Sequence, residues 1–241
     1  GDHLQLKRTR PASRGAATHL EYSTLQGHSA ALAKSSHPSC GLALCSLRSP
    51  PYTACLALAA VALGQHDSVG VFPFADDLTV LQRPTSGKNR VMELAHRLES
   101  VTPGGETDLG TALRRFRGLG LREGLVVIVS DFFDPGGIEA VTEALSGLRH
   151  RLLLVQLVRR SDRDPSWARG DLRLVDCESG DAQDVSVTPQ VLERYRAAYD
   201  RFAEGLAALA RRRGAGLLAL DVESDVIPQV ADLFENGRRE V

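Results

Sequence analysis

The sequence has few cysteines, and none has the spacing of a metal or disulfide motif. Cys40, Cys45, Cys55 and Cys177 include no Cys-x-x-Cys pair. A four-thiolate zinc site needs tighter spacing, and a disulfide framework is typical of smaller secreted proteins. The histidines of the first forty residues are irregularly spaced and follow no helix face. We therefore expect reduced, inert thiols and no zinc site.

A charge imbalance and long apolar runs are lacking as well. Lysine plus arginine (29) nearly equals aspartate plus glutamate (30), so no global charge draws the chain to nucleic acid or to an anionic membrane. No apolar run approaches the roughly 20 residues that cross a bilayer, and the N-terminus lacks the features of a signal peptide. These absences predict a cytoplasmic protein that neither binds nucleic acid nor inserts into a membrane.

The strongest positive signal is a short apolar run that ends in acids. Residues 125–129 are five consecutive apolar residues, typical of a strand covered on both faces in a parallel sheet. Ser130, Asp131 and Asp134 follow directly. Because open α/β sheets bind ligands outside the carboxyl ends of their strands, any site should lie here.

Strand and helix patterns alternate along most of the chain. This rhythm predicts an α/β fold, with a doubly wound, mostly parallel sheet flanked by helices and a small β-hairpin insertion. The expected strands are residues 41–47, 68–74, an antiparallel edge at 78–82, 125–129, 151–158 and 217–220, with the hairpin at 172–176 and 184–187. The expected helices are 52–63, 88–100, a helix ending near 118, 136–148, 189–213 and 225–236.

The first part of the chain differs in composition from the rest. Residues 1–39 are rich in Ser, Ala, His and Arg and keep neither helical nor strand periodicity, so we expect an irregular or disordered segment there. Residues 40–241 are expected to form one domain. The change in composition suggests a hypothesis: the first fifty residues come from a shifted reading frame or a degenerate gene start.

Several short motifs keep the order and spacing of a known bacterial family. From His66 onward, the chain resembles the DUF58 family, whose domain is a divergent von Willebrand factor A fold. The resemblance rests on residues 66–72, 104–110, 129–134 and 176–180 and on Arg194-Tyr195. Together these motifs extend over roughly three quarters of the chain.

The resemblance implies a cation site, called a metal-ion-dependent adhesion site, built from three loops. By position, Thr107 and Asp131 match the second and third loops, and Ser49 matches the last residue of the first. The other two ligands of the first loop are replaced by Cys45 and Leu47. Mg²⁺ prefers hard oxygen ligands, so we expect weak or absent metal binding.

The resemblance also implies a function. It suggests a non-enzymatic adaptor that acts with a MoxR-type AAA+ ATPase and a client protein, in the maturation or chaperoning of protein complexes. The chain has no P-loop, Gly-x-Gly-x-x-Gly motif or nucleophile elbow, which agrees with this expectation. The alternative is a metal-dependent hydrolase or phosphotransferase that uses Asp131 and Asp134, although no nucleophile or base is identifiable beside them.

Each candidate residue also has a simpler structural role. Asp131 can accept loop amides, Thr107 can cap the helix that follows it, and Asp134 can cap the helix after the central strand. Trp167, the only tryptophan, lies in a charged segment and can anchor a partner or fold back over the core. The sequence leaves these alternatives open.

Overall fold

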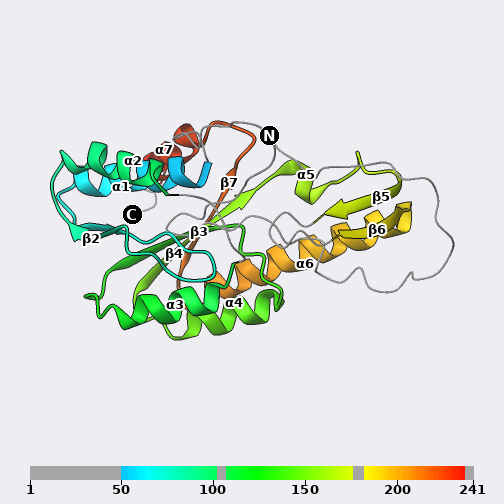
Figure 1. Cartoon of the computed structure of the whole chain (residues 1–241), viewed down its shortest axis with the longest axis horizontal. Coiled ribbons are helices and arrows are strands. Elements are labelled where there is room, and N and C mark those ends of the chain that lie inside the picture. Colours follow the sequence, from blue (N-terminus) through cyan, green and yellow to red (C-terminus); the bar gives the residue numbers. More distant parts are fainter. Residues whose placement is uncertain (1–49, 102–106, 176–181, 237–241) are drawn as a thin grey trace.

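The computed structural model describes residues 50–101, 107–175 and 182–236 (Figure 1). Its centre is a parallel sheet in the order β3–β4–β7, formed by Leu125–Ser130, Arg151–Val158 and Gly216–Asp221. In the register of this sheet, Ile128 lies beside Leu154, and Leu154 lies beside Leu217. The strands predicted at 125–129, 151–158 and 217–220 are therefore confirmed.

Helices cover both faces of this sheet. Figure 1 shows α1 (Pro50–Gly64) and α7 (Val226–Asn236) on one side, with α3 (Leu109–Gly118) and α4 (Gly137–Ser146) on the other. The second side is completed by α6 (Pro189–Arg213), whose Phe202, Leu206 and Leu209 join the same apolar cluster. Two covered faces explain the unbroken apolar runs of the strands, because successive side chains point to opposite sides.

Successive side chains of β3 pack alternately on the two faces of the sheet. Val126 and Ile128 pack into the cluster under α3, α4 and α6, whereas Val127 and Val129 pack into the cluster under α1 and α7. Full burial of a Val, Leu, Ile or Phe side chain stabilises the fold by roughly 1.5–3 kcal/mol. The largest cluster lies on the α3–α4–α6 side and holds half of the buried apolar residues in the described part of the chain.

The segment before α3 differs from the prediction. β1 is only Val69–Val71 and pairs antiparallel with β2, Gln82–Thr85, as a sheet separate from β3–β4–β7 among the described residues. The predicted edge at 78–82 reduces to one bridge between Phe74 and Leu78. Pro73 explains why β1 is shorter than predicted, because proline lacks the N–H that a strand interior needs. Pro84 lies inside β2, which is possible because a strand at a sheet edge tolerates proline.

The last part of the chain follows the prediction more closely. β5 (Gly170–Val175) and β6 (Ala182–Val187) form the expected hairpin, and Figure 1 shows it with the first half of α6, away from the central sheet. The Thr188 hydroxyl accepts a hydrogen bond from the N–H of Val191 (3.3 Å), which caps α6. Gly214 ends this helix at φ 58°, a left-handed conformation that glycine adopts without strain.

Two remaining helices complete the described chain. α2, Arg90–Glu99, lies within the predicted 88–100 and buries Leu94 and Leu98 against α1. The charged segment that leads to Trp167 contains a short helix, α5, at Arg160–Arg163. The strand predicted at 41–47 and the segment 1–39 lie outside the described residues.

Candidate functional site

Two buried polar residues stand where β3 ends, Ser130 as its last residue and Asp131 directly after it. Ser130 is 1% exposed and Asp131 is 5% exposed. The N–H of Phe132 donates to the Ser130 hydroxyl oxygen (2.9 Å), and the N–H of Phe133 donates to Oδ1 of Asp131 (3.1 Å). Both side chains therefore hold the turn that leaves β3, and the simpler role predicted for Asp131, acceptance of loop amides, is present.

Backbone strain marks the same turn. Phe132 has a φ of 61°, which is costly for a residue with a Cβ, and its ring is 1% exposed. Such a conformation costs about 1–3 kcal/mol and persists where the surroundings impose it. Here the burial of the Phe132 ring and the two side-chain hydrogen bonds oppose the strain. The turn after β3 is therefore held in one shape.

The second predicted position, Thr107, stands just before α3. Its hydroxyl oxygen is buried and finds no hydrogen-bond partner within the described part of the chain. The cap of α3 is instead Asp108, whose Oδ1 accepts from the N–H of Thr111 (2.7 Å). The capping role considered for Thr107 is therefore wrong, because the cap lies one residue later.

Asp108 is held by hydrogen bonds of both its backbone and its side chain. Its own N–H donates to the carbonyl of Ala75 (3.0 Å), and its carboxylate also accepts from the Thr111 hydroxyl. Burial raises the pKa of Asp108, but the bonds from Thr111 and the nearby Arg114 outweigh it and hold that pKa below its ordinary value. The start of α3 is thus anchored to the turn after β1.

Thr107 and Asp131 belong to the same end of the sheet. The other end of α3 lies at the amino end of the strands, since Phe116 contacts His150 (ring centroids 5.5 Å apart) just before β4. There the N–H of Gly124 also donates to Nδ1 of His150 (3.2 Å). A helix of this length spans about 15 Å. The first turn of α3 therefore points toward the carboxyl ends, where Asp131 lies.

Asp134 has a local role that differs slightly from the prediction. Its Oδ1 accepts from the N–H of Gly136 (2.8 Å), and its carbonyl accepts from the N–H of Gly137 (2.8 Å). α4 starts at Gly137 with Gly136 as its N-cap, so Asp134 is not the cap. Gly137 has a φ of 67°, which inserts a turn between Pro135 and the helix and delays its start.

Three further polar residues gather at this edge. Asp162 lies in α5 after β4, and the Tyr195 hydroxyl of α6 donates to its backbone carbonyl. Burial raises the pKa of Asp162, although the Arg159 guanidinium opposes the shift. Burial, Asp162 and, more weakly, Asp131 raise the pKa of Tyr199. Tyr199 also meets the ring of Phe133 edge-on, with centroids 5.9 Å apart.

Sequence reasoning did not assign Asp162 or Tyr199 to the site. Asp162 stands in an arginine-rich segment that looks like an ordinary loop, so no local pattern distinguishes it. Tyr195 and Tyr199 carry a usable signal, because a spacing of four places both on one face of a helix. That face looks toward the carboxyl ends of β3 and β4.

The described residues do not make up a full cation site. Thr107 and Asp131 offer hard oxygen ligands, but no group of three His, Cys, Asp or Glu side chains that could hold a metal ion occurs among residues 50–101, 107–175 and 182–236. Ser49, Cys45 and Leu47 lie outside these residues. Because Mg²⁺ requires six oxygen ligands, water and a partner would have to supply most of them.

A family model described as "Protein of unknown function DUF58" matches residues 33–205. The chain belongs to this family. The DUF58 match contains Thr107, Asp131 and the hairpin, and it ends inside α6. Within the described part of the chain, no helix combines the length and the apolar character that a bilayer crossing requires.

Relatives in mycobacteria share about half of this DUF58 chain. An uncharacterized protein of Mycobacterium avium is 27% identical over 132 residues, which cover 55% of the chain and 77% of that protein. An uncharacterized protein of Mycobacterium tuberculosis is 28% identical over 132 residues, and the match spans only 41% of its length. Among solved structures, a conserved hypothetical protein BatB from Bacteroides thetaiotaomicron is similar with a TM-score of 0.39 and 13% identity, over 78% of this chain and 87% of that one.

Proposed function

We propose that this DUF58 protein is a non-enzymatic protein-interaction module. In this proposal it is an adaptor that acts with a MoxR-type AAA+ ATPase on a client protein, in the maturation or chaperoning of protein complexes. The partner meets the carboxyl edge of the central sheet, around Thr107 and Asp131. The domain is of the von Willebrand factor A type, and its cytoplasmic location is part of the same proposal.

The observation that carries the proposal is the buried hydroxyl of Thr107 at this edge. It has no hydrogen-bond partner among the described residues, and it lies at the same end of the sheet as Asp131. A buried polar atom without a partner costs roughly 1–3 kcal/mol, so such atoms recur where a partner completes the bond. The strained, well-packed turn at Phe132 supports a rigid docking edge rather than a mobile one.

The hydrolase alternative has less support. In that alternative Asp131 and Asp134 would serve as metal ligands or as general acid and base. One oxygen of each carboxylate already accepts a backbone N–H, from Phe133 and Gly136 respectively. These bonds explain both carboxylates as parts of the turn between β3 and α4.

The proposal is tested by a pull-down from a bacterial lysate, with Mg²⁺ and with a chelator. The full chain is compared with Asp131→Asn, and the matched control is Asp232→Asn, an exposed carboxylate on α7. The proposal expects an AAA+ ATPase to be recovered by the wild type and by the control, and to be reduced with Asp131→Asn. Equal recovery by all three chains contradicts it. Hydrolysis of a phosphoester that Asp131→Asn abolishes would establish the enzymatic alternative.

A further inference from the structure

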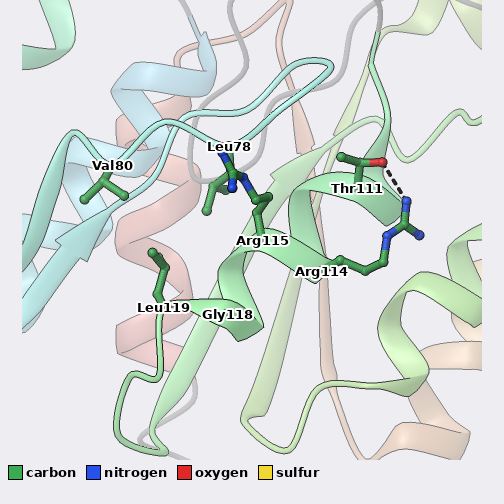
Figure 2. A pocket seen from close by; sticks show the side chains of 7 residues that line it. All are labelled: Leu78, Val80, Thr111, Arg114, Arg115, Gly118 and Leu119. Atoms are coloured by element: carbon green, nitrogen blue, oxygen red, sulfur yellow. Dashed lines mark hydrogen bonds between the residues drawn. The ribbon is translucent and has the colours of Figure 1, made fainter.

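A groove runs along one side of α3, and Asp131 is not among the residues that line it. It has a volume of about 510 Å³ and lies between the chain at residues 78–80 and one side of the helix (Figure 2). Seven residues line it: Leu78, Val80, Thr111, Arg114, Arg115, Gly118 and Leu119. The groove thus begins at the first turn of α3 and extends to the end of this helix.

The base and the outer wall of the groove are apolar. Leu78 and Leu119 are half-buried and pack against the main core cluster, which holds them in place. Val80 is 41% exposed, an unusual position for a branched apolar side chain. Gly118 adds no side chain, and nothing would obstruct a Cβ there. An apolar side chain from a partner can therefore enter without displacing any part of the core.

The rim of the groove is cationic. Arg114 and Arg115 are exposed, and no carboxylate belongs to the seven lining residues. Arg115 pairs with Asp77 outside the lining (3.1 Å and 3.2 Å), where both side chains are at least half exposed. Arg114 donates to the Thr111 hydroxyl (2.6 Å) and lies near the Asp108 carboxylate, which accepts from the same hydroxyl. Such exposed pairs contribute little, so both guanidinium groups can exchange their partners for a new carboxylate.

We propose that this groove binds an acidic segment of a partner protein, with an apolar side chain between Leu78, Val80 and Leu119 and carboxylates on Arg114 and Arg115. The ends of this chain have the wrong charge for it. Residues 1–39 contain Asp2 and Glu21 as their only acids against five Lys and Arg, and residues 237–241 read Gly-Arg-Arg-Glu-Val. Neither of these two segments therefore has the negative charge that the two arginines would attract. The proposal goes beyond the adaptor function, because it concerns a second surface.

The probe is a fluorescein-labelled peptide in which glutamate and leucine alternate with glycine, titrated with the full chain and followed by fluorescence anisotropy. Two variants remove one feature each: Arg114→Glu reverses a rim charge and Val80→Asp removes the apolar wall. Arg122→Glu is the matched control, since it makes the same charge change at an exposed residue outside the lining. Circular dichroism melting verifies that each variant is folded.

The expected result is binding that weakens by up to about fivefold in Arg114→Glu and Val80→Asp, since the loss of one exposed ion pair or one apolar contact costs at most about 1 kcal/mol. Arg122→Glu should keep the wild-type affinity, because Arg122 lies outside the lining of the groove. The absence of binding, equal affinity for a peptide with glutamine at every glutamate, or equal weakening by Arg122→Glu would each overturn the proposal. A dimer in sedimentation velocity that Arg114→Glu dissociates would assign the groove to a second copy and overturn it as well.

Discussion

The Tyr195 hydroxyl donates a hydrogen bond to the backbone carbonyl of Asp162, and this bond ties α6 to α5 at the carboxyl edge of the sheet. It joins residues 33 positions apart in the sequence. Tyr195 is half-buried, so its hydroxyl is partly shielded from competing water. The bond links the long helix to the segment that carries the half-buried carboxylate of Asp162.

Tyr195→Phe removes this bond and keeps the ring. We expect the free energy of unfolding to fall by about 1 kcal/mol, the usual contribution of one hydrogen bond. Urea unfolding at neutral pH measures it. Tyr199→Phe is the comparison, since phenylalanine preserves the edge-on contact with Phe133. A larger loss in Tyr199→Phe than in Tyr195→Phe would contradict the assignment.

The half-buried carboxyl of Asp162 should make stability depend on pH. Burial raises its pKa in the folded state above the unfolded value, so the folded protein holds the proton more tightly. The stabilisation that this gives is complete below the ordinary pKa of an aspartate and is lost as the pH rises through the folded value. Asp162→Asn removes the titration. We therefore expect its urea midpoint, relative to wild type, to increase from pH 4 to pH 7, and a constant difference would argue against this.

The cap of α3 offers a test of the anchoring at Asp108. Asp108→Ala leaves the N–H of Thr111 without its acceptor, and loss of such a cap costs about 0.5–2 kcal/mol. Asp108→Asn should retain most of the stability, because an amide oxygen can accept the same bond. Thermal unfolding of the two variants gives the comparison. If both variants lose the same amount of stability, the charge of Asp108 rather than its hydrogen bond stabilises the start of α3.

The sequence-based predictions were most accurate where apolar stretches or capping residues mark the bounds of an element. β4 was predicted with its observed bounds, because residues 152–158 are apolar except for Gln156, as is typical of a strand covered on both faces. α6 was predicted with its observed bounds because Thr188, Pro189 and Gly214 mark its two ends. β2 was misplaced because Pro84 suggested a loop, whereas an edge strand tolerates proline.

The candidate site was predictable only in part. Asp131 could be placed because the end of a buried strand fixes its position in the sheet. Asp162 could not, since its burial depends on the packing of α5 against α6, two segments that meet only in the folded chain. The cap at Asp108 also escaped prediction, because Thr107 and Asp108 are both good capping residues and the choice between them depends on the contact with Ala75.

The incomplete set of cation ligands predicts weak or absent metal binding. Calorimetric titration of the full chain with Mg²⁺ should give no saturable heat at concentrations where a complete site of this kind would fill. Saturable binding that Asp131→Asn removes would contradict the prediction. It would mean that residues outside the described ranges complete the site.

Phe132 should reveal how strongly the turn after β3 is constrained. Phe132→Ala deletes a buried ring, which costs about 3–5 kcal/mol, and leaves a Cβ on a residue with a φ of 61°. Phe132→Gly deletes the same ring but relieves the left-handed strain, which stabilises the folded state by roughly 1–2 kcal/mol. Glycine also makes the unfolded chain more flexible, and this offsets part of the gain. We therefore expect Phe132→Gly to be more stable than Phe132→Ala by about 1 kcal/mol. Chemical denaturation of both variants provides the measurement. If alanine is the more stable of the two, the turn relaxes when the ring is lost, and the rigidity inferred for this edge arises from the packing of Phe132 alone.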